Sequence, residues 1–209
     1  SLDMFDGIAS LSVATNADVS RAYVRVSPAT PDNIYPAGTS LTLSPVIVDP
    51  DVVLAHWIVN GVEHRESPLR LTLAANTSIS AVFAFPTVTL SVVSASILAD
   101  GSSSSQISIL VRNGASIAVP NAQITLSTTL GTIADTVTSG TNGVATAVLR
   151  SGITLGRADV TATYHGSQGQ TSVMFVAGPP ATIEIGAGST TLVADGASNS
   201  TVVAVVRDV

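Results

Sequence analysis

Three histidines, His56, His64 and His165, are the side chains of this 209-residue sequence best suited to coordinate a transition metal. His56 and His64 flank the dipeptide Asn60-Gly61, which favours a tight hairpin, so their rings could face each other across paired strands. No third ligand stands at a convincing spacing from them. We therefore expect exposed hairpin histidines here and no metal site.

Aspartate occurs at positions that could either bind a cation or shape a turn. Asp49-Pro50-Asp51 could supply part of a Ca²⁺ site, but such a site needs more oxygen ligands than this stretch offers. A proline-centred turn is the favoured interpretation. Asp100 and Asp195 each precede a glycine, and we expect each carboxylate to cap a turn in which that glycine takes a positive φ.

Sequence patterns typical of catalysis are missing. The sequence has no Cys and all eight basic residues are Arg, which excludes thiolate ligands, Schiff-base chemistry and a P-loop lysine. Neither Gly-x-Ser-x-Gly nor His-Glu-x-x-His occurs, and the carboxylates show no spacing typical of glycoside hydrolysis. We therefore predict no enzyme activity, no catalytic residue and no cofactor. A net charge of −6 leaves no basic face for a nucleic acid partner.

The single tryptophan, Trp57, decides between two further interpretations. An exposed Trp57 could stack on a sugar ring, as expected of a carbohydrate- or protein-binding accessory module of an extracellular enzyme. Its neighbours Ile58 and Val59 instead favour a place in a hydrophobic core.

The elements that must position these residues are strands. Hydrophobic residues make up 45% of the sequence but aromatic residues only 4%, and the aliphatic residues alternate with Ser and Thr. No apolar run approaches the roughly 20 residues that a membrane helix needs. The sequence thus predicts an all-β protein. Residues 1–6 lack the features of a signal peptide, as expected of a mature or excised piece.

A repeat divides the chain into tandem modules. Ala99-Asp100-Gly101 and the alternating run after it recur at Ala194-Asp195-Gly196, an offset of 194 − 99 = 95 residues, which is the length of one small domain. The sequence therefore predicts four segments. They are an N-terminal strand or linker over 1–20, a small β-repeat module over 21–85, an Ig-like β-sandwich over 86–178 and the truncated start of a second Ig-like domain over 181–209.

Alternation and turn dipeptides locate the individual strands. About seven short strands separated by regular turns within roughly 90 residues are typical of an Ig-like sandwich. In residues 86–178 we expect strands over 87–93, 106–112, 122–127, 144–149, 158–164 and 172–176. Before residue 86 we expect strands over 7–15, 22–27, 39–44, 52–59, 69–73 and 78–85.

Four motifs follow Ala99-Asp100-Gly101 in a fixed order within residues 86–178. They are Val119-Pro120-Asn121-Ala122, Leu130-Gly131-Thr132-Ile133, Thr141-Asn142-Gly143-Val144 and Ala158-Asp159-Val160-Thr161. In these motifs the segment resembles the bacterial Ig-like domain of the invasin/intimin type (group 1), and residues 181–209 resemble the start of the same domain. Residues 112–115 differ from the turn that the family usually has at this place. This difference changes one loop and leaves the order and spacing of the motifs intact.

Residues 21–85 carry a different set of motifs. They include Val24-Arg25-Val26-Ser27-Pro28, Tyr35-Pro36-Ala37-Gly38-Thr39, Trp57-Ile58-Val59-Asn60-Gly61 and Ser78-Ile79-Ser80-Ala81-Val82-Phe83. This segment resembles the divergent bacterial repeat related to internalin B-repeats, although Pro31-Asp32-Asn33 stands where the family has Gly-Gly. The resemblance implies a small β-rich module of an exported protein.

The invasin/intimin resemblance implies a function at the bacterial surface. Ig-like modules of that family are mostly spacers that hold a receptor-binding head away from the cell. It therefore implies a stalk segment of a cell-surface or secreted adhesin, whose host protein or glycan partner binds outside these residues. Within the chain, the partners of each module are the neighbouring Ig-like domains. The accessory binding module remains the alternative.

The last segment raises a question of stability. Two or three strands are not stable alone in water, and their open edges invite pairing. We therefore expect residues 181–209 to pair with residues 7–15 or with another chain. Gly178-Pro179-Pro180 precedes them and predicts a stiff linker, because proline fixes φ.

Overall fold

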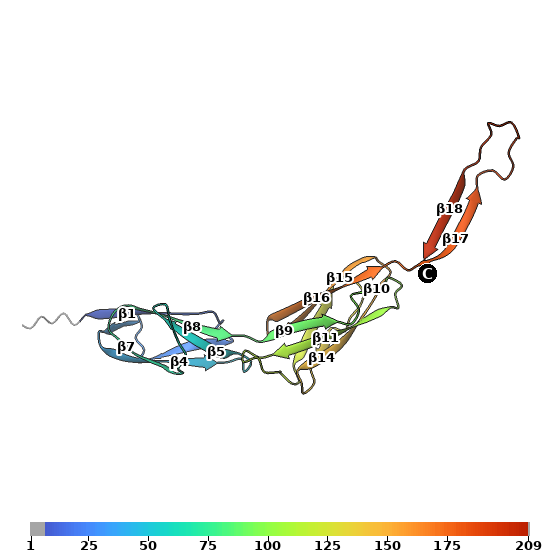
Figure 1. Ribbon diagram of the computed structural model, residues 1–209. Coiled ribbons are helices and arrows are strands. Elements are labelled where there is room, and N and C mark those ends of the chain that lie inside the picture. The colour runs from blue at the N-terminus through green and yellow to red at the C-terminus, as the bar shows by residue number, and fades with distance from the viewer. Residues whose placement is uncertain (1–6, 209) are drawn as a thin grey trace, which may run out of the picture.

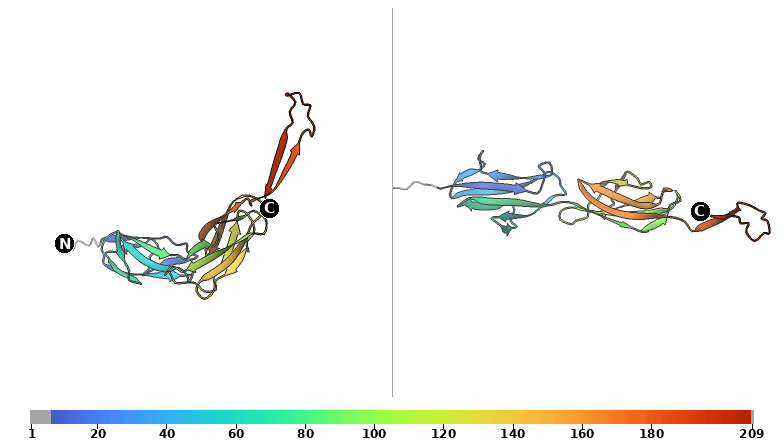
Figure 2. Two further views of the ribbon diagram at one scale, coloured as in Figure 1. Left: turned by 45° about the vertical axis from the view of Figure 1, so that its right-hand side comes forward. Right: turned by 90° about the horizontal axis from the view of Figure 1, so that it is seen from above.

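The computed structural model describes residues 7–208, and every regular element in that range is a strand (Figure 1). Two sandwich units follow one another along an extended molecule, and a lone hairpin projects beyond the second unit (Figures 1 and 2). Residues 7–208 contain no helix of the length and apolar character needed to cross a membrane. The N-terminal residues 1–6, whose sequence lacks the features of a signal peptide, lie outside the described range.

The first unit packs a sheet of order β3-β1-β8-β5-β6 against one of order β2-β4-β7. Its strands are β1 (Ile8–Thr15), β2 (Ala22–Ser27), β3 (Ile34–Pro36), β4 (Thr39–Ile47), β5 (Val53–Val59), β6 (Val62–His64), β7 (Leu69–Leu73) and β8 (Thr77–Ala84). Alternate side chains of both sheets point inward, so Leu41, Leu43, Trp57 and Ile79 meet in one core.

Strand β1 lies inside this unit, which corrects the expected division of the chain at residue 20. Its residues Leu11–Thr15 pair in parallel with β8, and Ala9 and Leu11 are buried in the core. Asn16, directly after β1, holds the chain against the same sheet. Its side-chain amide donates to the Phe83 carbonyl at 2.9 Å and accepts from the Phe83 N–H at 2.8 Å.

Strand β4 continues past its expected end at residue 44. Pro45 pairs with Val24 of β2, whereas β7 pairs with β4 only over Thr39–Leu43. The side of Pro45 that lacks an N–H therefore faces no neighbouring strand, and the proline does not interrupt the sheet.

The second unit has sheets of order β10-β16-β15-β12-β13 and β14-β11-β9. Its strands are β9 (Thr87–Val92), β10 (Ser96–Leu98), β11 (Ser104–Arg112), β12 (Gln123–Thr128), β13 (Thr136–Thr138), β14 (Val144–Arg150), β15 (Gly156–Tyr164) and β16 (Ser167–Val176). Ile107, Ile109, Leu149 and Phe175 lie in its aliphatic core. The predicted all-β fold with an Ig-like sandwich is confirmed. The three-residue strands were missed because they are too short to show alternation.

The C-terminal hairpin repeats the first pairing of the second unit. Strands β17 (Pro180–Ala187) and β18 (Val202–Asp208) pair from Thr182↔Arg207 to Ala187↔Val202. Strands β9 and β11 pair from Thr87↔Arg112 to Val92↔Ile107, which is the same register 95 residues earlier. The repeat seen in the sequence is therefore also a repeat of strand pairing.

The expected pairing of residues 181–209 with residues 7–15 is wrong. Strand β1 pairs with β3 over Ile8–Ser10 and with β8 over Leu11–Thr15, and among the described residues it makes no pairing with the hairpin. Within the described residues β17 and β18 pair with each other alone, and Ile183 and Ile185 are 64% and 73% exposed. Pairing with another chain stays a prediction.

Candidate functional site at the junction of the two units

Two turns, one from each sandwich, form the junction between the units. Asp49-Pro50-Asp51 makes the expected proline-centred turn between β4 and β5, in which the Asp51 N–H donates to Asp49 Oδ1 at 3.0 Å. His165 and Gly166 form the tight turn between β15 and β16, with φ values of 44° and 76°. These positive φ values fit a two-residue hairpin turn, so the turn sequence His-Gly holds the imidazole at the end of the second unit.

Side chains cross the junction in both directions. The Tyr164 hydroxyl donates to Asp51 Oδ2 at 2.5 Å. The His165 Nδ1 lies 3.1 Å from Asp49 Oδ1 and 3.7 Å from Asp51 Oδ2. The Tyr164 and His165 rings stack at a centroid distance of 4.2 Å and an interplanar angle of 8°. This stacking orients the imidazole toward the carboxylates.

Arg21 of the first unit fixes one of these carboxylates. Its Nε and Nη2 donate to Asp49 Oδ2 at 3.2 and 3.0 Å, and its guanidinium lies 4.6 Å from the centre of the Phe85 ring. The Asp49 side chain is only 9% exposed. A two-pronged ion pair packed on an aromatic ring holds Asp49 in one orientation.

The backbones of the two units also touch. The Gly114 N–H donates to the Asp51 carbonyl at 2.8 Å. A Cβ at position 114 would overlap the Ala84 carbonyl and press on the Val53 side chain, so only glycine allows this approach. The junction is therefore a direct contact between two folded units.

The electrostatics of the junction follow from burial and hydrogen bonding. Burial raises the pKa of Asp49, but hydrogen bonds from the Asp51 N–H, His165 and Arg21 outweigh it, so the pKa lies below its ordinary value. Burial, together with the adjacent Asp51 carboxylate, raises the pKa of the Tyr164 hydroxyl well above 10. Tyr164 is thus a hydrogen-bond donor throughout the neutral range.

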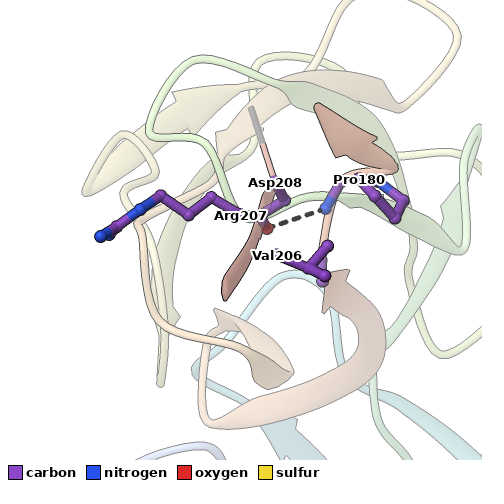
Figure 3. A pocket seen from close by; sticks show the side chains of 6 residues that line it. Pro180, Val206, Arg207 and Asp208 are labelled. Atoms are coloured by element: carbon purple, nitrogen blue, oxygen red, sulfur yellow. Dashed lines mark hydrogen bonds between the residues drawn. The ribbon is translucent and has the colours of Figure 1, made fainter. Parts of the chain in front are cut away.

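The connection after the second unit is much sparser. Asp208 Oδ2 accepts the Gly178 N–H at 3.2 Å, the dashed line in Figure 3, while Arg207 extends away from this contact. A shallow pocket opens between Ala177, Pro180 and Val206. Within the described residues, fewer hydrogen bonds cross this connection than cross the first junction, so the stiffness predicted for Gly178-Pro179-Pro180 rests on its prolines.

The other residues considered for metal or sugar binding have structural roles. His64 pairs with Trp57 across the β5–β6 hairpin, so His56 points to the opposite face and the two rings do not meet. Both are half-buried, rather than exposed as expected. Trp57 is fully buried and its Nε1 donates to the Glu66 carbonyl at 2.9 Å. The alternative in which an exposed Trp57 stacks on a sugar ring is therefore wrong, and the predicted position of Trp57 in a hydrophobic core is confirmed.

The two repeated aspartates cap turns, as expected. Asp100 accepts the Ser102 and Ser103 N–H groups at 2.8 and 2.6 Å, and Asp195 accepts the equivalent groups of Ala197 and Ser198 at 2.9 and 2.7 Å. The following glycines have φ values of 74° and 73°. These hydrogen bonds lower the pKa of Asp195 to about 2 and that of Asp100 further still.

Sequence reasoning missed the junction because its members are 116 residues apart. Asp49-Pro50-Asp51 predicts a turn and His165 lies in another unit, and no local spacing relates the two aspartates to the histidine. The one available signal was that each lies in a turn at the end of a unit.

The fold and the junction define a class of protein: tandem β-sandwich modules joined end to end. Residues 86–178, less than half of the chain, match the family model described as invasin, domain 3. This unit is an Ig-like domain of the invasin/intimin type, as its motifs predicted. No curated protein matches the chain.

Three solved structures are similar to the chain at low identity. The adhesin InvE of Yersinia pseudotuberculosis is 21% identical with a TM-score of 0.42, covering 50% of this chain and 29% of that one. A 282-residue intimin fragment in complex with the intimin-binding domain of its translocated receptor is 21% identical with a TM-score of 0.40, covering 56% and 44%. Invasin, titled a bacterial integrin-binding protein, is 19% identical with a TM-score of 0.46, covering 87% and 45%. The chain thus spans less than half the length of each structure, and the family match alone assigns the second unit.

Proposed function

We propose that this chain is a spacer segment of a bacterial cell-surface or secreted adhesin, and that it holds a receptor-binding head domain away from the cell. The observation that carries this proposal is the junction, in which Tyr164 and His165 of one unit bind Asp51 and Asp49 of the other. A spacer needs resistance to bending between its modules, and these contacts supply it.

The family of the second unit supports the adhesin context. Its match is to a domain of invasin, and invasin and intimin are described as binding an integrin and a translocated receptor. We infer that a host protein is the final partner of the protein that carries this segment, and that the segment lies outside the cell. In this role the segment does no chemistry of its own.

The proposal is tested by measuring the distance between the units in solution. The absence of cysteine allows clean spin labelling at Thr72→Cys in β7 and Ser127→Cys in β12, two exposed positions on different units. Pulsed electron paramagnetic resonance should give one narrow distance distribution. The matched control carries a flexible Gly-Ser insertion between Phe85 and Pro86, which should broaden the distribution. Equal breadth in the two proteins would contradict the spacer role.

A further inference from the structure

We propose that the junction binds a divalent transition metal, with Zn²⁺ as the best fit, through Asp49, Asp51 and His165. The proposal rests on the proposed function, because the metal would join two ligands of the first unit to one ligand of the second. It adds a ligand to the junction that the spacer role alone does not require.

The donor atoms are already gathered. One oxygen of each aspartate and the imidazole nitrogen all lie within 4.8 Å of one another. The carboxylate side chains are 9% and 14% exposed, whereas the His165 side chain is 47% exposed. The two carboxylate ligands are thus held in place by the surrounding fold. The exposed His165 leaves one side of the site open, where water can complete the coordination.

Charge at the junction favours a cation. Asp49 and Asp51 place two carboxylates side by side, and Arg21 forms an ion pair with only the first of them. Asp51 receives a hydrogen bond from Tyr164, which is a neutral donor. The two carboxylates and the one guanidinium leave one negative charge that Arg21 does not compensate, and a bound cation would neutralise it.

The existing hydrogen bonds leave room for such an ion. Arg21 occupies Oδ2 of Asp49, while His165 and the Asp51 N–H approach Oδ1, which can still offer a lone pair. Binding would replace the contact between His165 and Asp49 with two metal bonds and leave the Arg21 pair intact. The stacked Tyr164 would orient the imidazole, as outer partners of metal ligands do.

The mixture of ligands selects the kind of metal. Imidazole with two carboxylates suits Zn²⁺ and similar ions, whereas Ca²⁺ takes six to eight oxygens and does not use imidazole. The carboxylate pair alone could supply only part of a Ca²⁺ site. The histidine that the second unit contributes changes the chemistry of the site.

The test is a calorimetric titration of the full chain with Zn²⁺. We expect one ion per chain, and a loss of affinity of about tenfold or more in His165→Asn and in Asp51→Asn, since removing a ligand should cost at least as much as removing an outer partner. Asparagine tolerates the positive φ of position 165, so the first variant keeps the turn. His64→Asn is the matched control and should bind as the parent does.

A second measurement locates the ion and separates the two proposals. In ¹H–¹⁵N spectra of the imidazoles, Zn²⁺ should shift the His165 nitrogens and leave those of His56 and His64 in place. Absence of binding, or equal binding in His165→Asn, overturns the metal site. The spin-label distances are then measured both in chelator and with Zn²⁺ added. A narrow distribution in chelator supports the spacer role even if the metal site fails. A broad distribution with Zn²⁺ bound contradicts the spacer role while the metal site stands.

Discussion

Tyr164 of the second unit donates a 2.5 Å hydrogen bond to Asp51 of the first, across a sequence separation of 113 residues. Tyr164 is 7% exposed and closes the core of its own sandwich, so the same side chain belongs to a core and to the junction. We therefore expect the stability of the first unit to depend on a residue of the second.

That dependence can be measured with the single tryptophan. Trp57 lies in the core of the first unit, so its fluorescence reports the unfolding of that unit. Tyr164→Phe leaves the half-buried Asp51 carboxylate without its donor, and hydrogen bonds to charged groups contribute about 2 kcal/mol. We expect the free energy of unfolding obtained from the urea transition of Trp57 fluorescence to fall by up to about 2 kcal/mol. The control is Ser105→Ala, which removes a buried hydrogen bond to Ser94 in the second unit and should leave the Trp57 transition in place.

The close approach at Gly114 gives a steric test of the junction. Gly114→Ala puts a methyl group against the Ala84 backbone and weakens the hydrogen bond to Asp51, at a cost of about 1–3 kcal/mol for overpacking. We expect the spin-label distances between the units to broaden. Gly152→Ala meets nothing closer than 4.0 Å and should leave the distribution narrow. Identical distributions in the two variants would mean that this backbone contact does not fix the units.

The capped turn at Asp100 predicts a dependence of stability on pH. Hydrogen bonds from the Ser103 and Ser102 N–H groups hold the pKa of Asp100 below its ordinary value, so the stabilisation is present above the unfolded pKa, near 3.9, and is lost as the pH falls through the folded pKa. Asp100→Asn should lower Tm at pH 7, and the difference from the parent should shrink below about pH 4. The exposed Asp135→Asn is the control, and a Tm gap independent of pH would refute the assignment.

The repeated register offers a comparison within one molecule. Strands β9 and β11 pair as β17 and β18 do, but the first pair is covered by a second sheet and the hairpin is not. Two-stranded hairpins are marginally stable in water. Where the chain is alone in solution, we expect the amides of Thr182–Ala187 to exchange with deuterium far faster than those of Thr87–Val92. Equal protection would point to a partner strand on the hairpin, as the prediction of pairing with another chain requires.

Local sequence determined the strands and the turns. Alternation of aliphatic and hydroxyl side chains fixes both the extended backbone and the face that turns inward, so β2 and β7 begin and end where expected. Asn60-Gly61 and Asp100-Gly101 specify their turns through positive φ and a side-chain cap, which act within four residues. The family of the second unit also follows from such motifs.

Tertiary structure alone decided which distant segments meet. The parallel pairing of β1 with β8 and the approach of His165 to Asp49 join residues more than 60 positions apart, and no local pattern encodes either contact. The first depends on which sheet edge is open, and the second on how one folded unit seats on the next. The sequence determined the modules, and their packing created the junction to which we assign the function.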